Sequence, residues 1–293
     1  MTPPNATAII TSATLGHEAT DMNFKDKQLA ASRKNRSLLC VGLDPDPELM
    51  PGIDIFQFNR EIIDATSDLV CAYKPNLAFY EASGIEGLRA MEKTLAHVPS
   101  GIPVIGDAKR GDIASTSKAY ARALFDVFGF DAVTVNPYLG HDSVSPFTDY
   151  GDKGVFILCK TSNAGASDFQ EALVCESEGG KGARPLFESV ALKANMWNTQ
   201  GNIGLVVGAT YPEQLRKVRQ LCPEIQLLVP GIGAQGGDLA STIRNGVDAH
   251  WQNLIITCSR QVLYASRERD FATAARREAL KIREQINEYL AAG

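Results

Sequence analysis

Short apolar runs alternate with amphipathic segments along most of the chain, from about residue 24 onward. Eight of these runs are brief and rich in β-branched residues, a pattern typical of buried strands. The expected strands are 38–43, 70–74, 103–109, 132–135, 155–159, 203–207, 226–229 and 254–258. Helical spacing of apolar positions predicts helices at 56–69, 84–97, 116–128, 186–197 and 212–221, and a last amphipathic helix at 271–290.

Strands that are apolar throughout, each followed by a helix, predict a parallel sheet that is buried on both faces. Eight such units predict an α/β fold: a closed (β/α)8 barrel, also called a TIM barrel, forming a single domain over 21–293. The alternative is a doubly wound open sheet, although no G-x-G-x-x-G motif follows the first strand. Residues 1–20 lack sustained periodicity and are expected to form a loosely ordered, flexible extension.

The segment 163–184 is too long for an ordinary barrel loop and contains a glycine-rich stretch. Two interpretations are open. It is either a lid over the site or a solvated insertion without a role, because its Ser, Glu and Gly content does not separate the two.

The composition indicates the class of protein to which the chain belongs. The chain has 293 residues, 44% of them hydrophobic and 22% charged, with a net charge of −5, which is typical of a soluble protein and not of one that binds nucleic acid. No apolar stretch is long enough for a membrane span, and the first residues lack a secretory signal pattern. The six cysteines show no C-x-x-C pairing and the four histidines no metal-ligand spacing. We expect a cytoplasmic protein with no metal and no membrane partner.

A dense group of charges follows the apolar run 103–106: Asp107, Lys109, Arg110 and Asp112 lie within six residues. Side chains alternate along a strand, so Asp107 and Lys109 should share a face, and Gly111 should let the chain bend before Asp112. A salt bridge at a strand end would also produce this pattern. The rest of the sequence must therefore show whether these charges form a structural salt bridge or a group of reactive side chains.

Polar residues also gather where the predicted strands end, which is the side on which a barrel carries its active site. They are Asp44, Lys74, Asp107, Lys109, Asn136, Thr161, Gln235 and Arg260. A glycine-rich segment at 230–237 follows the seventh strand, and Ser259 and Arg260 follow the eighth. Loops after these two strands commonly bind phosphate, with backbone N–H groups and an arginine as donors. The sequence predicts a phosphorylated ligand.

These motifs, taken in order, resemble one family, the orotidine 5'-phosphate decarboxylases, and in particular their longer bacterial type 2 subfamily. The matching stretches are V-G-L-D-P-D at 41–46, Y-K-P-N at 73–76, D-A-K-R-G-D-I at 107–113, V-N-P-Y at 135–138, P-G-I-G-A-Q at 230–235 and S-R at 259–260. The resemblance implies a carboxy-lyase (EC 4.1.1.23) that decarboxylates orotidine 5'-monophosphate to UMP in pyrimidine biosynthesis, without metal or organic cofactor.

The resemblance also implies roles for individual residues. Lys74, Asp107, Lys109 and Asp112 would form an alternating charged network, with Asp112 reaching the site of a second subunit in a homodimer. The substrate contacts implied are Asp44 and Lys74 with the ribose, Asp112 and Thr116 with the sugar across the interface, Ser162 with the pyrimidine, and Pro230, Gln235, Ser259 and Arg260 around the phosphate. The chain departs from the family at Ala164, where a proline is common, which affects the pose of this loop.

The chemistry itself favours Lys109 as the central residue. Loss of CO2 from C6 of the pyrimidine leaves electron density without an adjacent sink, so a fixed positive charge must stand beside that carbon. The Lys109 ammonium can stabilise this carbanion and then protonate it. Two other hypotheses stay open: a metal-assisted sugar-phosphate lyase such as a hexulose-phosphate synthase, and a noncatalytic sensor of phosphoribosyl ligands.

Overall fold

Eight parallel strands form one sheet in the order β2-β1-β10-β9-β8-β5-β4-β3, and the sheet closes on itself. The computed structural model describes residues 22–175, 182–232, 237–250 and 252–292. Closure is made between β2 and β3, where Tyr73 N donates to Pro103 O at 3.0 Å and Asn76 bridges to Asp107. The strands are β1 (Leu39–Leu43), β2 (Ala72–Pro75), β3 (Ile105–Arg110), β4 (Ala132–Val135), β5 (Gly154–Lys160), β8 (Ile203–Val207), β9 (Gln226–Pro230) and β10 (Leu254–Cys258).

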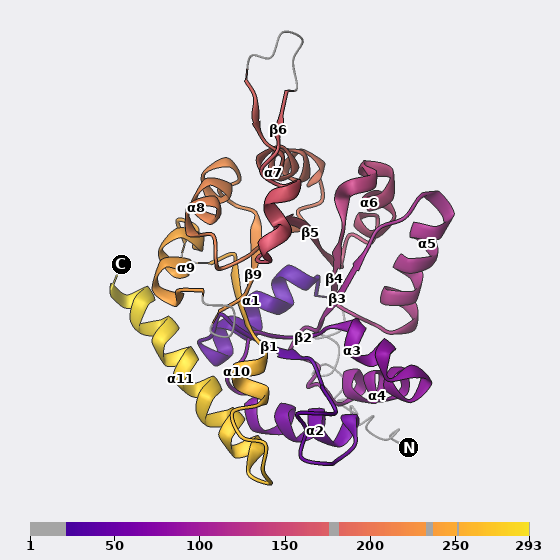
Figure 1. Ribbon diagram of the computed structural model, residues 1–293, viewed down its shortest axis with the longest axis vertical. Coiled ribbons are helices and arrows are strands. Elements are labelled where there is room, and N and C mark those ends of the chain that lie inside the picture. The colour runs from indigo at the N-terminus through magenta and orange to yellow at the C-terminus, as the bar shows by residue number, and fades with distance from the viewer. Residues whose placement is uncertain (1–21, 176–181, 233–236, 251, 293) are drawn as a thin grey trace, which may run out of the picture.

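Helices surround this barrel (Figure 1). Each amphipathic helix turns its apolar stripe toward the strands, which is the packing that the sequence pattern requires. The α-helices are α1 (Phe24–Asn35), α2 (Ile55–Thr66), α3 (Leu77–Ala82), α4 (Gly84–His97), α5 (Ala114–Arg122), α6 (His141–Thr148), α7 (Leu186–Trp197), α8 (Pro212–Leu221), α9 (Leu239–Gly246), α10 (Arg260–Leu263) and α11 (Phe271–Ala292). Shorter helical turns are η1 (Ala123–Val127), η2 (Pro137–Leu139) and η3 (Ala164–Asp168).

Two apolar clusters follow from the alternation of side chains along each strand. The larger cluster lies between the strands and the surrounding helices. The smaller one fills the barrel interior and consists of Phe24, Cys40, Cys71, Ala72, Ile105, Ala132, Phe156, Val206, Leu228 and Ile255. Inside it, the ring of Phe24 meets the ring of Phe156 edge to face, with centroids 5.6 Å apart. The first residue of α1 thus helps to close the N-terminal end of the barrel.

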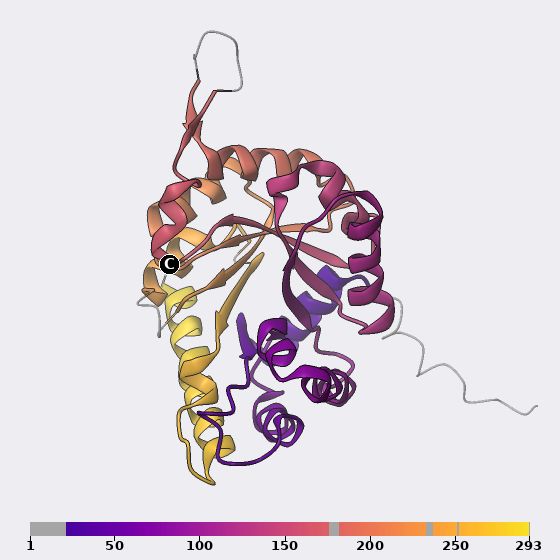
Figure 2. The same ribbon diagram turned by 45° about the vertical axis from the view of Figure 1, so that its right-hand side comes forward.

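The long segment 163–184, interpreted above as a lid or an insertion, contains a short hairpin. Its strands, β6 (Leu173–Val174) and β7 (Arg184–Pro185), pair antiparallel. The hairpin projects away from the body of the molecule beyond α7 (Figures 1 and 2). Its described residues therefore lie beside the barrel and not across it, and the lid interpretation stays a hypothesis.

The predicted barrel is confirmed, and all eight predicted strands are present with ends that differ by at most two residues. The predicted helix 116–128 is in fact α5 followed by the π-turn η1. The extension predicted at 1–20 lies outside the described residues. Among the helices that the structure describes, none has both the length and the apolar character needed to cross a membrane.

Candidate active site

A cavity of about 470 Å³ opens at the C-terminal ends of the strands. This is the end of a parallel barrel at which side chains from many strands converge. Its lining comes from the ends of β1, β2, β3, β4, β5, β8, β9 and β10 and the segments that follow them: Asp44, Lys74, Asn76, Phe79, Asp107, Lys109, Thr134, Leu158, Thr161, Ser162, Asn163, Val206, Leu228, Pro230, Gly231, Ile232, Thr257, Ser259 and Arg260.

Asp107 stands between two ammonium groups in this cavity. Lys74 Nζ lies 2.8 Å from Asp107 Oδ2, and Lys109 Nζ lies 2.6 Å from Asp107 Oδ1. The Lys74 side chain is buried, whereas that of Lys109 is 46% exposed. One ammonium is therefore fixed within the protein, and the other is presented to the cavity.

Ion pairing between Asp107 and its lysine neighbours outweighs the effect of burial on the pKa values of Asp107 and Lys74. Burial by itself raises the pKa of the Asp107 carboxyl, but the ammonium groups of Lys74 and Lys109 hold that pKa below its usual value. Burial likewise lowers the pKa of Lys74, and the carboxylates of Asp107 and Asp44 outweigh it, so that the pKa of this ammonium is raised. Asp107 and Lys74 are accordingly both charged at neutral pH.

The backbone at Lys109 adopts an unusual conformation. Its φ is +48°, in the left-handed region that residues with a Cβ seldom adopt. The register between β3 and β4 shifts over the same stretch, between Gly106 and Arg110. Such a strained irregularity at the end of a strand re-aims a side chain, and here it directs the lysine that carries the exposed ammonium.

Thr134 holds this irregular stretch in place. Its hydroxyl accepts a hydrogen bond from Lys109 N at 2.9 Å and donates one to Asp107 Oδ1 at 2.9 Å. Thr134 is not among the site residues predicted from the sequence. The available signal was a lone hydroxyl within the apolar strand A-V-T-V, at a position whose side chain points inward with that of Ala132.

A glycine is needed at position 111 because a larger residue would collide with the neighbouring segment. A Cβ at this position would lie 2.7 Å from Asn136 O, and the φ of Gly111 is not among the positive glycine values. Gly111 is therefore required for the close approach to Asn136 and not for a left-handed φ, and its role in bending the chain stays a prediction. The unusual φ values of this stretch belong to Lys109 and, at +40°, to Ala114.

The segment 161–163 forms another side of the cavity. Gly208, at the end of β8, allows it to pass closely, because a Cβ there would lie 2.9 Å from Ser162 N. Thr161 Oγ1 donates to Asn163 Oδ1 at 2.6 Å within the segment. The turn is thus closely packed at its base and presents polar groups to the cavity.

Most of the residues predicted to react or bind meet in this one cavity. Those that line it are Asp44, Lys74, Asp107, Lys109, Ser162, Pro230, Ser259 and Arg260. Asp112 and Thr116 do not line it, and Asn136, a strand-end residue, instead accepts a hydrogen bond from Tyr138 N at 3.0 Å. Gln235 lies outside the described residues. Among the described residues there is no group of three or more His, Cys, Asp or Glu placed to hold a metal ion.

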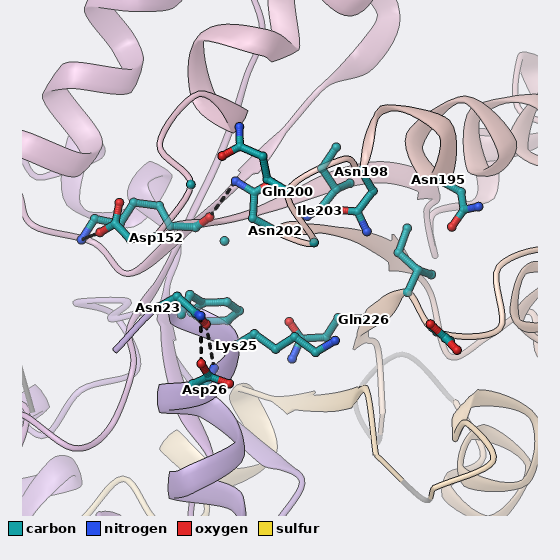
Figure 3. Close-up of a pocket in the computed structure, with 17 residues that line it drawn as sticks. Asn23, Lys25, Asp26, Asp152, Asn195, Asn198, Gln200, Asn202, Ile203 and Gln226 are labelled. Atoms are coloured by element: carbon teal, nitrogen blue, oxygen red, sulfur yellow. Dashed lines mark hydrogen bonds and ion pairs between the residues drawn. The ribbon is translucent and has the colours of Figure 1, made fainter. Parts of the chain in front are cut away.

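A second cavity, also of about 470 Å³, lies at the opposite end of the barrel (Figure 3). Its amide side chains bind groups of the chain itself. Asn202 Nδ2 donates to the carbonyl oxygens of Thr148, Tyr150 and Lys153, and Asn198 Oδ1 accepts from Ile203 N. These contacts fasten the loops at the N-terminal ends of the strands, where residues of a barrel usually serve stability.

The comparisons with known proteins agree with the fold. The family model described as "Orotidine 5'-phosphate decarboxylase / HUMPS family" matches residues 37–276. An orotidine 5'-phosphate decarboxylase of Dehalococcoides mccartyi is 54% identical over 92% of this chain and 98% of its own length.

Two solved structures from Leishmania donovani are also similar. The OMP decarboxylase has a TM-score of 0.81 and 40% identity, and the match covers 93% of this chain and all of that one. The UMP synthase has a TM-score of 0.82 and 43% identity over 92% of this chain, which spans only 56% of that longer protein. On these matches, together with the eight-stranded barrel and its charged cavity, the chain belongs to the orotidine 5'-phosphate decarboxylase / HUMPS family.

Proposed function

We propose that this chain decarboxylates orotidine 5'-monophosphate to UMP and CO2 in pyrimidine biosynthesis. The observation that carries the proposal is the half-exposed Lys109 side chain, whose ammonium lies 2.6 Å from Asp107 Oδ1 in a cavity that Arg260 also lines. Relatives that bear this enzyme's name reach 54% identity over nearly the whole chain. The reaction needs no organic cofactor, because the charge that it requires is supplied by a side chain.

Lys109 carries the chemical step. Departure of CO2 places an electron pair on C6, and a cation fixed beside that carbon lowers the energy of the transition state. The ammonium then transfers a proton to C6, which completes the product. Because the ion pair already orients the ammonium, little reorganisation is needed when the negative charge develops.

Asp107 and Lys74 support this step. Asp107 holds the Lys109 ammonium in place, with Oδ1 2.6 Å from Nζ. Lys74 keeps Asp107 ionised in turn, at a distance of 2.8 Å. The substrate carboxylate would stand beside Asp107, where repulsion between like charges favours its loss as neutral CO2.

The two ends of the nucleotide have separate partners. Arg260, Ser259 and the side chain of Gln235 receive the phosphate beside Pro230, while Asp44 and Lys74 hold the ribose hydroxyls. Ser162 contacts the pyrimidine. Contacts to the phosphate are remote from the reacting carbon, yet their binding energy can be used to orient the substrate and exclude water.

The active form is a homodimer in which Asp112 and Thr116 complete the sugar site of the neighbouring subunit. Neither residue lines the cavity of its own chain, which supports a role in another. Ile113 is 60% exposed and Tyr138 is 80% exposed, and Gly111 and Asn136 bring their two segments into contact. Large exposed apolar side chains next to one another are typical of a protein interface.

The enzyme acts in the cytoplasm. The six cysteines are free, and five of them are buried. Such buried thiols fit a reducing compartment, where they behave as small apolar side chains.

Turnover of the purified protein tests the function. Orotidine 5'-monophosphate is converted to UMP with a change in ultraviolet absorbance, and we expect this conversion to proceed equally with and without EDTA. Lys109→Ala should abolish detectable turnover and keep its fold, because Asp107 retains Lys74 as a partner. Full activity of the folded variant would overturn the role of Lys109. EDTA-sensitive activity on a sugar phosphate would instead favour a hexulose-phosphate synthase.

A further inference from the structure

Lys160 is a buried charge that the proposed mechanism leaves unused. It is the last residue of β5, its side chain is 0% exposed, and it does not line the active-site cavity. Within the described part of the chain its ammonium makes no hydrogen bond of normal geometry. Burying an ammonium is costly unless other groups compensate its charge, so its surroundings should show what it does.

Two groups compensate the charge, and they come from different segments. Glu171 Oε1 lies 3.1 Å from Lys160 Nζ, between η3 and the β6–β7 hairpin. The ring centroid of Tyr211, the residue before α8, lies 4.0 Å from the same atom. A cation over an aromatic face is attracted by the ring, and more strongly away from water. Lys160 therefore joins the hairpin segment and the start of α8 to the end of β5.

Both of these segments also contact residues 161–163. Gln170, next to Glu171, accepts from Thr161 N at 2.9 Å and donates to Thr161 Oγ1 at 2.8 Å. Tyr211 Oη donates to Asn163 O at 3.4 Å. Segment 161–163 is thus held at its start by the neighbour of Glu171 and at its end by the hydroxyl of Tyr211. All three of its residues line the active-site cavity.

We propose that Lys160 is a positioning residue that fixes segment 161–163 for contact with the pyrimidine ring. The inference rests on the proposed function, in which Ser162 contacts this ring. Lys160 itself touches no substrate. Its loss should therefore weaken recognition of the base, while recognition of the sugar phosphate persists, because Asp44 and Arg260 belong to other strand ends.

The variant Lys160→Met suits the test because it should fold. Methionine fills a similar volume, and an apolar residue in place of a buried ionic one is often neutral for stability. Glu171 is 41% exposed, so its carboxylate can remain hydrated once the ammonium is gone. A matched control is Lys217→Met in α8, whose exposed ammonium lies 4.0 Å from Glu188 and away from segment 161–163.

The experiment measures the dissociation constants of UMP and of ribose 5-phosphate by calorimetry, for the full-length chain and both variants. In Lys160→Met we expect UMP to bind about tenfold more weakly and ribose 5-phosphate to bind within about twofold of the unchanged protein, where tenfold corresponds to ~1.4 kcal/mol. Lys217→Met should bind both ligands as the unchanged protein does.

Equal weakening of both ligands in Lys160→Met would show a general structural role and overturn the inference, as would unchanged UMP binding. If Lys160→Met does not fold, Glu171→Gln provides the same test, since it removes the ion pair at the more exposed partner. Failure of the proposed function gives a different result. In that case the unchanged protein itself would bind UMP no more tightly than ribose 5-phosphate.

Discussion

Lys109 shows how much a single residue depends on its immediate neighbours. Its φ of +48° costs free energy for a residue with a Cβ, on the order of 1–2 kcal/mol. The backbone bond to Thr134 and the ion pair to Asp107 hold it there. The irregular backbone at Lys109 thus forms part of the site, because it carries the ammonium that lies 2.6 Å from Asp107 Oδ1.

Thr134→Val tests this view at the residue scale. Valine keeps the shape of threonine but leaves Lys109 N without its acceptor and Asp107 without one donor. We expect kcat to fall about tenfold or more, equivalent to at least ~1.4 kcal/mol, with KM little changed. Thr134→Ser should restore kcat. Thr242→Val, at a buried threonine in α9, is the matched control and should leave kcat unchanged.

Arg260→Ala examines the phosphate end of the cavity. Removing a charge-assisted contact should lower kcat/KM by an amount equivalent to about 2–4 kcal/mol. Steady-state kinetics with orotidine 5'-monophosphate measure the loss, and Arg267→Ala, an exposed residue outside the cavity lining, serves as control. Wild-type efficiency in Arg260→Ala would remove this residue from the phosphate site.

At the scale of elements, a second buried cation holds several helices and strands together. Arg219 of α8 donates hydrogen bonds to carbonyl oxygens near the ends of α8, α9 and β9 and before β10. Its acceptors are the carbonyl oxygens of Gly246, Cys222, Pro223, Ile225 and Asn253. Burial lowers the pKa of this guanidinium to about 10, so that it stays charged at neutral pH. One side chain thus binds carbonyl groups at several helix and strand ends at once.

Arg219→Met should destabilise the barrel without touching the cavity. The variant leaves buried carbonyl groups unpaired, so we expect the free energy of unfolding to fall by about 3 kcal/mol. Denaturant unfolding measures this change. Arg216→Met on the same helix removes an exposed arginine paired with Glu213 and should change stability by less than about 0.5 kcal/mol. Similar losses in the two variants would refute the bridging role.

At the scale of the whole molecule, the two ends of the barrel have different tasks. The N-terminal end is closed by α1 and by loops that Asn202 fastens (Figure 3). The C-terminal end carries the charged cavity. Asp112 lies just after β3 yet outside this cavity. The single chain therefore holds most of a site, and the proposed dimer would supply the remainder.

Mixing two inactive variants tests the shared site. In a mixed dimer of Lys109→Ala and Asp112→Ala chains, one site lacks both residues and the other has both. If subunits exchange freely, half of the dimers are mixed, so activity should recover to about a quarter of the wild-type value. Neither variant alone should be active. No recovery after verified exchange of subunits would place Asp112 in the site of its own chain.

The sequence by itself determined the barrel and most of its site. Apolar strands alternating with amphipathic helices leave few other ways to bury so much apolar surface, and strand-end residues such as Asp44, Lys74 and Asp107 then meet at one edge. The tertiary structure alone decided what depends on contacts between distant segments. Thr134 binds across to β3, Gly111 makes room for Asn136, and Lys160 meets Glu171 and Tyr211. Hydrophobic periodicity is a local property, whereas strain and the pairing of buried charges depend on partners that only the folded chain brings together.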